Sequence, residues 1–332
     1  MTPAPLALSL GDPAGVGPEI VAKAWAALKD SGPSFIVIGD ATLVAAAGRN
    51  APVKRIGAAS DARTVFSKAI PVLDLPLSSP VVAGQPSASH APHIIRWIET
   101  GVGLALSRQV SGLVTAPIAK APLYEAGFKF PGHTEFLAEL TGEAAHEGVR
   151  GPVMMLTAGD LRVVLVTIHE PLAKVSGLLN VEKIVNTAIC TVQALRRDFG
   201  IERPRLAVAG LNPHAGESGS IGREEVEIIA PAVEALRAQG VEVTGPSPAD
   251  TLFHAEARAA YDAVVCMYHD QALIPVKMLD FWGGVNVTLG LPIVRTSPDH
   301  GTGFDIAGRG HARPDSLIAA IRLAAEIAAR RA

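Results

Sequence analysis

Several features that would assign the 332-residue chain to a familiar class are scarce or missing. Its only cysteines, Cys190 and Cys266, lie far apart in apolar surroundings. Neither a disulfide framework nor a cysteine zinc motif is therefore available, and both residues are expected to be buried thiols. The net charge is −3, and no cluster of Lys and Arg is available to bind the phosphate backbone of a nucleic acid. The sequence therefore argues against a nucleic-acid-binding protein.

Targeting and membrane signals are also lacking. No apolar run approaches the roughly 18 residues that a membrane span needs. The first residues, MTPAPLALSLGDPAG, lack a basic region and reach Gly-Asp-Pro after a strand-length apolar segment, so they do not resemble a signal peptide. The sequence predicts a soluble cytoplasmic protein.

Hydrophobic residues make up 48% of the chain and aromatic residues only 5%, which suits small-residue helices packed on a sheet of branched side chains. Apolar runs near 6–10, 35–38, 112–116, 153–156, 162–168, 205–210 and 263–267 alternate with helix-like stretches at 18–29, 91–108, 180–198, 223–238 and 316–331. This alternation predicts an α/β fold with a mainly parallel sheet.

The length favours two lobes that share a cleft, because a single core stops growing at roughly 250 to 300 residues. The Pro- and Gly-containing stretch 75–92 is a candidate lobe connection, or simply a long loop. The lobe boundaries are not fixed by the sequence.

Three histidines, His169, His214 and His269, each follow a short apolar run. In parallel sheets, ligands collect outside the carboxyl ends of the strands, so three imidazoles at strand ends could converge on one metal site with open coordination positions. Their spacing matches no local metal motif, and each alone could be a hydrogen-bonded turn residue. Asp270 could orient a metal ligand, add a carboxylate to the site or serve as a helix N-cap.

Other polar residues suit an anion. The segment FPGHTEF places His133 and Thr134 before a helix, where backbone amides and a hydroxyl can bind an anion, although Thr134 could be an ordinary N-cap. Lys277, Asn286 and Arg295 lie in an apolar context where polar side chains need partners. A Lys, an Asn and an Arg that converge would bind a phosphate or carboxylate.

Two glycine-rich turns are further candidates. GDPAGVGPEI (11–20) fails the G-x-G-x-x-G spacing, and its glycines either let the backbone approach a ligand or form a strained turn without one. The loop 299–308 is rich in glycine and polar side chains, and could equally be a long surface turn.

Taken together, the blocks GDPAGVGPE, TAPIAK, GHTEF, LNPHAGE, IGREE, MYHDQ, GVNVTLGLP and RTSPDHGTGFDIAG resemble the 4-hydroxythreonine-4-phosphate dehydrogenase family of pyridoxal phosphate biosynthesis, in order from about residue 6 to residue 310. That family oxidises 4-phosphooxy-threonine with NAD or NADP, and the product loses carbon dioxide to give 3-amino-2-oxopropyl phosphate. The resemblance implies a two-lobed fold similar to that of isocitrate and isopropylmalate dehydrogenases, and a homodimer whose active site lies at the subunit interface.

The resemblance also assigns roles to residues. It implies a divalent metal (zinc, magnesium or cobalt) on His169, His214 and His269, contributed by both chains. It implies substrate contacts at His133, Thr134, Lys277, Asn286 and Arg295. A cofactor loop would use His300, Gly301, Thr302, Gly303, Asp305 and Gly308. Ala272 departs from the family, many members of which have Gly there, and a backbone position with negative φ would tolerate the change.

The hypothesis for the reaction is that the metal chelates the substrate's hydroxyl and a neighbouring group, so that Lewis-acid polarisation lowers the alcohol's pKa. Lys277 and Asp270 are the candidates for proton handling, and Lys277 could instead neutralise the phosphate. Related subgroups oxidise threonate or erythronate 4-phosphate, or an aromatic dihydrodiol carboxylate. A metal-dependent hydrolase and a non-catalytic phosphometabolite-binding protein are the alternatives from other classes.

Overall fold

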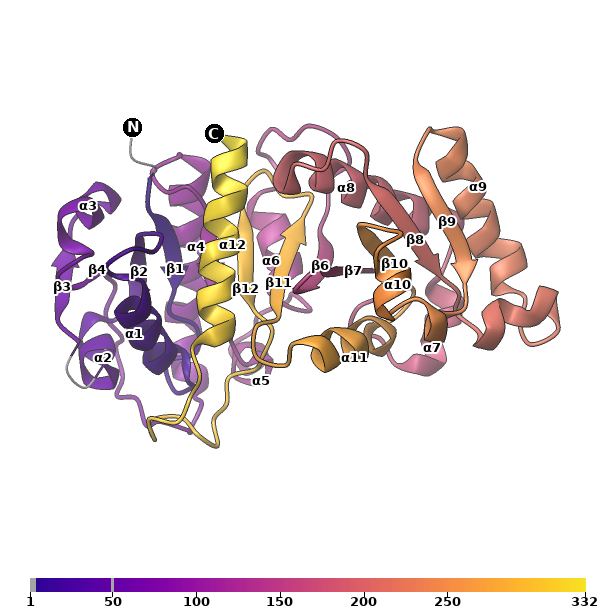
Figure 1. Ribbon diagram of the computed structural model, residues 1–332. Coiled ribbons are helices and arrows are strands. Elements are labelled where there is room, and N and C mark those ends of the chain that lie inside the picture. Colours follow the sequence, from indigo (N-terminus) through magenta and orange to yellow (C-terminus); the bar gives the residue numbers. More distant parts are fainter. Residues whose placement is uncertain (1–3, 49–50) are drawn as a thin grey trace. The chain divides into compact units, whose positions relative to one another are not determined.

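The computed structural model describes residues 4–48 and 51–332. The chain divides into two compact units (Figure 1). Unit 1 contains the residues up to Ala145 together with Pro292–Arg330, and unit 2 contains His146–Leu291 and Arg331. The stretch 75–92 lies wholly inside unit 1, which favours a long loop over a lobe connection. The cleft expected between two lobes stays a prediction.

The strands of unit 1 are all paired in parallel, in the order β3-β4-β2-β1-β5-β12. Every residue of β1 and β2 is buried, as expected for strands covered by helices on both faces. The strands are β1 (Leu6–Ser9), β2 (Phe35–Gly39), β3 (Val53–Ile56), β4 (Ile70–Asp74), β5 (Leu113–Thr115) and β12 (Arg295–Pro298). The helices are α1 (Gly17–Leu28), α2 (Ala41–Ala47), α3 (Ala62–Val65), α4 (Ala91–Leu106), α5 (Lys120–Glu125), α6 (His133–Leu140) and α12 (Asp315–Arg331), with short turns η1 (Ala59–Asp61) and η2 (Ala88–His90).

Unit 2 has the strand order β11-β6-β7-β10-β8-β9. The pairs β6–β7 and β6–β11 are antiparallel and the other pairs are parallel. The strands are β6 (Val153–Ala158), β7 (Leu161–Leu165), β8 (Arg205–Ala209), β9 (Glu242–Ser247), β10 (Ala263–Cys266) and β11 (Val285–Leu289). The helical elements are α7 (Leu172–Leu178), α8 (Val181–Phe199), η3 (Pro213–Gly219), η4 (Glu225–Ile229), α9 (Ala230–Ala238), η5 (Ala249–Thr251), α10 (Ala255–Arg258) and α11 (His269–Leu279).

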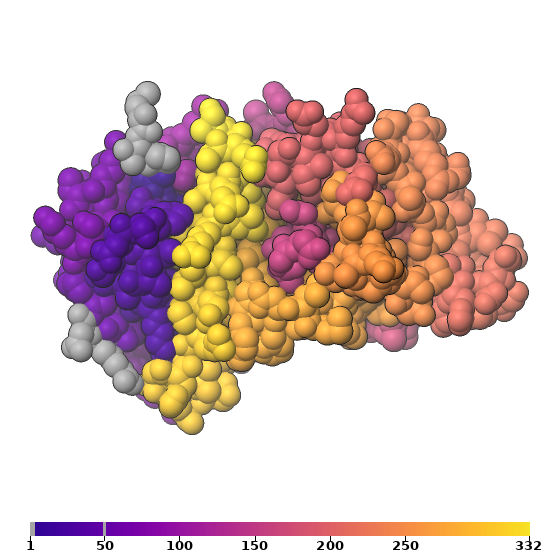
Figure 2. Space-filling model, viewed as in Figure 1, coloured from indigo at the N-terminus to yellow at the C-terminus, as the bar shows by residue number. Residues whose placement is uncertain are grey.

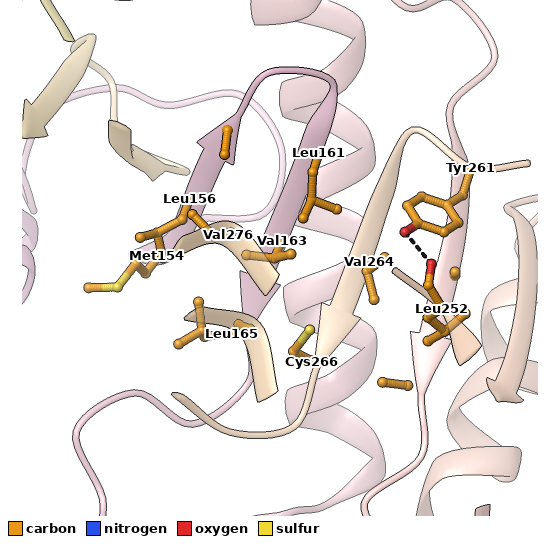
Figure 3. Packing of buried hydrophobic residues seen from close by; sticks show 14 residues of the cluster. Met154, Leu156, Leu161, Val163, Leu165, Leu252, Tyr261, Val264, Cys266 and Val276 are labelled. Carbon is orange, nitrogen blue, oxygen red and sulfur yellow. Dashed lines mark hydrogen bonds between the residues drawn. The ribbon is translucent and has the colours of Figure 1, made fainter. Parts of the chain in front are cut away.

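The core of unit 2 is packed around the central strands β7 and β10 (Figure 3). Leu165 at the end of β7 is paired in register with Cys266 at the end of β10, and both are buried. At the other end of β10, the Tyr261 hydroxyl donates to the Leu252 carbonyl at 2.7 Å, which satisfies a buried polar group. The core therefore fixes the carboxyl ends of β7 and β10 at the same level.

The predicted fold class is confirmed: the chain is an α/β protein with mostly parallel strands. Both cysteines are buried free thiols, and burial raises the pKa of Cys190 to about 12. The helix expected at 223–238 is instead a π-helical turn, η4, followed by α9. Among the described helices, none is long and apolar enough to cross a membrane.

Candidate active site

His169 and His269 meet because their strands are parallel neighbours. Just beyond the strands, the Val166 amide donates to the Cys266 carbonyl at 2.9 Å and the Thr167 hydroxyl donates to the Met267 carbonyl at 2.7 Å. The two segments therefore leave the sheet together. The imidazole centroids lie 5.7 Å apart with the ring planes tilted by 40°. Two of the three histidines predicted at strand ends are thus adjacent within one chain.

Asp270 fixes the orientation of the His269 ring. Its Oδ1 lies 2.7 Å from Nδ1 of His269, and an ionised carboxylate can only accept, so Nδ1 carries the proton. Nε2 is then the ring atom with a lone pair for a ligand, the arrangement common among metal-binding histidines. Helix α11 begins at His269 with Tyr268 as its N-cap, so the alternative of Asp270 as an N-cap is wrong.

Gln271 joins the ends of two strands. Its buried side chain accepts from the Met267 amide and donates to the Gly210 carbonyl, both at 2.7 Å. It thereby connects the segment after β10 to the segment after β8. The neighbouring Ala272 lies inside α11, and helical residues have negative φ. Alanine is therefore tolerated at this position, where many family members have glycine.

His214 is held in an unusual backbone conformation. It begins a run of six residues with positive φ, ending at Gly219, of which only Gly216 and Gly219 are glycine. Left-handed conformation costs roughly 1–2 kcal/mol for each non-glycine residue, and such strain is concentrated at functional sites. The His214 side chain is 69% exposed, and its Nδ1 lies 3.9 Å from the Glu217 carboxylate.

Glu225 holds the segment that leads to this turn. Its Oε1 accepts from the amides of Leu211 and Asn212, each at 2.7 Å, and its Oε2 accepts from the Asn212 side chain at 2.9 Å. Glu224 also accepts from the Asn212 side chain at 2.7 Å. Because Glu225 is buried, these hydrogen bonds make a rigid support that keeps His214 at the surface.

Within the described part of one chain, no three His, Cys, Asp or Glu side chains are grouped to hold a metal ion. His169 and His269 form a pair, and His214 is not grouped with them. The set of three as metal ligands stays a prediction. The pair fits two positions of a coordination sphere, because both donors are imidazoles and Asp270 fixes one of them.

A cationic cluster forms at the N-terminus of α6 in unit 1. His133 and Thr134 occupy its first turn, and because Gly132 is the N-cap, the N-cap interpretation of Thr134 is wrong. Arg295, 3% exposed, donates from Nη2 to the Thr115 hydroxyl at 2.7 Å. Burial holds the pKa of His133 well below its usual range, and the charges of Arg295 and Lys120 lower it further.

Burial lowers the pKa of Arg295 to about 10, while Glu135 opposes this shift. The guanidinium remains charged at neutral pH. Nε2 of His133 is shielded from solvent, and no hydrogen-bond partner for it exists among the described residues. A charged donor, a neutral imidazole and a helix N-terminus therefore face one another, which is a suitable environment for an anion.

The other two predicted substrate residues belong to unit 2. Lys277 lies in α11 with its Nζ 5.3 Å from the centre of the Phe281 ring. Asn286 lies in β11 opposite Leu156 of β6, and its Oδ1 is buried without a hydrogen-bond partner in the described ranges. Convergence of Lys277 and Asn286 with His133, Thr134 and Arg295 stays a prediction.

The loop 299–312 of unit 1 is anchored to the start of α1. The Val16 amide donates to the Thr302 carbonyl at 2.8 Å. Glu19 accepts from the amides of Gly310 and Ala312 at 3.2 and 3.0 Å. Lys23 donates to the carbonyls of the same two residues at 2.9 and 2.6 Å and to Glu19 at 2.7 Å. We call this arrangement the Glu19–Lys23 clamp.

The glycines of GDPAGVGPEI are needed for packing within the protein. A Cβ on Gly11 would meet the Pro117 carbonyl oxygen at 2.5 Å, and one on Gly15 would meet that of Thr302 at 2.8 Å. A Cβ on Gly17 would meet the Leu10 oxygen at 2.3 Å. Protein backbone therefore occupies the space that the sequence allowed for a ligand. In the loop itself, Gly303 and Gly308 have φ of 56° and 74°, which glycine adopts readily.

Asp12, Glu19 and Lys120 were missed by sequence reasoning. Asp12 is buried, and its carboxylate accepts from the amides of Ala14 and Ala119. Burial raises the pKa of Asp12, although those hydrogen bonds and the charge of His90 oppose the shift. The blocks GDPAGVGPE and TAPIAK contain these residues, but nothing in the sequence shows which of their side chains face one another.

Comparisons with known proteins identify relatives over the whole chain. The profile of the family described as pyridoxal phosphate biosynthetic protein PdxA matches residues 32–324. A 4-hydroxythreonine-4-phosphate dehydrogenase of Caulobacter vibrioides is 73% identical over 331 residues, covering 100% of this chain and 99% of the relative. One from Maricaulis maris is 56% identical, with 99% and 98% covered.

Solved structures agree with the sequence relatives. A 4-hydroxythreonine-4-phosphate dehydrogenase from Klebsiella pneumoniae has a TM-score of 0.85 and 42% identity, with 98% of each chain covered. A terephthalate 1,2-cis-dihydrodiol dehydrogenase from Burkholderia xenovorans has a TM-score of 0.64 and 31% identity, with 97% of each chain covered.

Proposed function

The chain belongs to the PdxA family, and from that membership we propose that it is a metal- and NAD(P)-dependent dehydrogenase that oxidises 4-phosphooxy-threonine and releases 3-amino-2-oxopropyl phosphate after decarboxylation. The family, the α/β fold and the role as an oxidoreductase of pyridoxal phosphate biosynthesis, predicted from the motifs, are confirmed. The observation that carries the proposal is the adjacent pair His169 and His269, with Asp270 fixed on the His269 ring.

The metal site would use the imidazoles of His169, His214 and His269. A bound divalent metal supplies Lewis-acid polarisation of the substrate's hydroxyl. Asp270 holds the His269 ring so that Nε2 faces the ligand position, and Glu225 supports the turn that carries His214. The contribution of these side chains is to fix the donors before the substrate arrives.

The phosphate end of the substrate would bind at the cluster of unit 1. The His133 imidazole is neutral, so it can donate one hydrogen bond without adding charge. Arg295 supplies a buried positive charge and the first turn of α6 supplies amides. Lys277 and Asn286 complete the proposed set, with Lys277 and Asp270 as the candidates for holding or moving a proton.

The dinucleotide would bind along residues 300–308, through His300, Gly301, Thr302, Gly303, Asp305 and Gly308. The Glu19–Lys23 clamp and the Val16 amide support this proposal, because they hold the loop at both ends while leaving its glycine-rich middle for a ligand. When NAD or NADP is bound it supplies the hydride acceptor.

We propose that two copies of the chain form a homodimer and that His214 completes a site with the pair from the partner subunit. The outer side of α11 supports this proposal: Ile274 and Met278 are 67% and 73% exposed, and α11 lies at the surface in Figure 2. Phe281 and Trp282 extend the exposed apolar area just after the helix. Single apolar residues at a surface are common. Four exposed apolar side chains on and just after α11, the helix that begins with His269, are more typical of an interface. The cytoplasmic location stays a prediction.

The proposed function is tested by following NAD(P) reduction with 4-phosphooxy-threonine. We expect a rate that disappears on chelation and returns with zinc, magnesium or cobalt. A rate that is insensitive to chelator, or no rate with any phosphorylated hydroxy acid, would contradict the proposal. Turnover confined to threonate or erythronate 4-phosphate would keep the reaction class and change the substrate.

The dimer proposal has its own test. Glu at positions 274 and 278 (Ile274→Glu with Met278→Glu) places two charges in the apolar area. We expect the molecular mass measured by light scattering to fall to that of one chain, with metal stoichiometry falling at the same time. Arg237→Glu, at an exposed ion pair in α9 of unit 2, is the matched charge control and should leave the mass unchanged.

A further inference from the structure

Lys120 is a cation that no role described so far uses. It begins α5, and its side chain lies against the N-cap of α6. A Cβ built on Gly132 would be 3.5 Å from Cε and 3.6 Å from Nζ of Lys120. Lys120 is also a source of the positive potential that lowers the pKa of His133. Its ammonium therefore faces the same small region as His133 and Arg295.

The charges around this region do not balance. Lys120, Arg295 and the partial positive charge of the α6 N-terminus all face it. One carboxylate, that of Glu135, lies near the N-terminus of α6. Its Oε2 is 3.2 Å from the Cβ position of Gly132, and its negative charge opposes the lowering of the Arg295 pKa by burial. Within residues 4–48 and 51–332, the Lys120 ammonium makes neither a hydrogen bond nor an ion pair. A lysine beside a helix N-terminus is unfavourable unless an anion joins it.

The backbone before Lys120 is also fixed. Asp12 accepts a hydrogen bond from the Ala119 amide, the N-cap of α5, and the Asp12 amide donates to the Pro117 carbonyl at 2.9 Å. The start of α5 is held against the turn that follows β1, which fixes the backbone position from which the Lys120 side chain extends.

We propose that Lys120 is a phosphate-binding residue of this enzyme and that it gives the site its preference for a dianionic group. The role of Lys120 in substrate binding rests on the proposed function, whereas its binding of inorganic phosphate can be tested without it. Arg295 already donates to Thr115 and His133 is neutral, so a single buried guanidinium would face the two negative charges of a phosphate. Lys120 supplies the second positive charge as a compact point charge.

The binding test uses inorganic phosphate and the full chain. Its dissociation constant is measured by calorimetric titration for the wild type and for Lys120→Met, at constant ionic strength set with chloride. We expect Lys120→Met to weaken phosphate about 10- to 100-fold, the range for a lost hydrogen bond between charged groups. Lys129→Met removes an exposed lysine from the same segment and should leave the constant unchanged.

Lys120→Arg keeps the charge and should restore most of the affinity. Phosphate affinity that is equal in the wild type and Lys120→Met, or lost equally in Lys129→Met, would overturn the inference. Thermal unfolding of each variant shows whether it is folded. If Lys120→Met does not fold, Lys120→Gln and Lys120→Arg decide the question: affinity that does not follow the charge at this position overturns the inference.

Kinetics separate the inference from the proposed function. Lys120→Met should raise KM for the phosphorylated substrate and leave KM for the dinucleotide unchanged. If phosphate binding depends on Lys120 but no phosphorylated hydroxy acid is turned over, the inference stands and the proposed function fails. If the wild type turns over the substrate and Lys120→Met has the same KM, the inference fails and the proposed function stands.

Discussion

The rings of His169 and His269 lie 5.7 Å apart between centroids because Leu165 and Cys266, at the ends of their strands, are paired in parallel register. The pair is therefore a product of the sheet. Neither histidine needs a local motif to find the other, since the hydrogen bonds that continue beyond the strands bring both segments out at the same edge.

Asp270→Asn should weaken metal binding about 10- to 100-fold, because the carboxylate fixes the proton on Nδ1 of His269 and raises the basicity of Nε2. The affinity is measured by titration of the metal-free protein with zinc or cobalt. Asp160→Asn is the control, because Asp160 is exposed and paired with Arg258 in the same unit. Equal affinities for Asp270→Asn and the wild type would show that Asp270 has no orienting role.

Glu225→Ala should lower the free energy of unfolding by about 2–4 kcal/mol, since it leaves the amides of Leu211 and Asn212 without their acceptor. Urea unfolding gives the value. Glu227→Ala, two residues on, removes only an exposed ion pair with Arg223 and should cost less than about 1 kcal/mol. Similar losses in both variants would rule out a special role for Glu225.

Lys23→Met should raise KM for the dinucleotide about tenfold, because Lys23 holds the carbonyls of Gly310 and Ala312 at the end of the proposed cofactor loop. KM for the phosphorylated substrate should change little. Arg55→Met is the control, since its partners, Asp74 and Thr42, lie outside the loop. A rise in both KM values together would indicate a general structural effect.

The stability of the wild type should fall as pH is lowered, in part because of His133. Its pKa in the folded chain lies well below the value of about 6.5 for an unfolded chain. Between those two pKa values the unfolded chain binds the extra proton, so the free energy of unfolding falls as the pH falls through this window. His133→Gln should flatten this part of the curve, measured by urea unfolding from pH 7.5 downwards. Parallel curves for the two proteins would contradict the assignment.

The sequence allowed seven of the described strands to be predicted because they are continuous apolar runs, whereas β4, β11 and β12, which are mostly buried, were missed along with two edge strands. All seven predicted runs are strands, and two of them, β7 and β10, carry the histidine pair. The edge strand β3 was missed because its middle residues, Lys54 and Arg55, are charged and exposed. β9 was missed because Glu242, Gly245 and Pro246 interrupt its pattern. Edge strands bury little surface, so the hydrophobic pattern that identifies central strands is weak there.

The site was less predictable than the fold. The turn that begins at His214 contains Gly216 and Gly219, but nothing in the sequence shows that His214, Ala215, Glu217 and Ser218 also adopt positive φ. Its conformation depends on Glu225, which lies on another element. Lys120 was missed because a lysine at the start of a helix is normally a solvated residue. Only the structure shows that it faces Gly132.

The Asp12 carboxylate makes two hydrogen bonds that connect the proposed phosphate site with the proposed dinucleotide loop. One bond goes to Ala14, in the turn that approaches Thr302, and the other goes to Ala119, directly before Lys120. Under the proposed function, phosphate would bind beside the start of α5 and the dinucleotide beside Thr302, so the Asp12 carboxylate lies between the two proposed sites. If binding of one ligand shifts this carboxylate, thermodynamics requires each ligand to change the other's dissociation constant by the same factor.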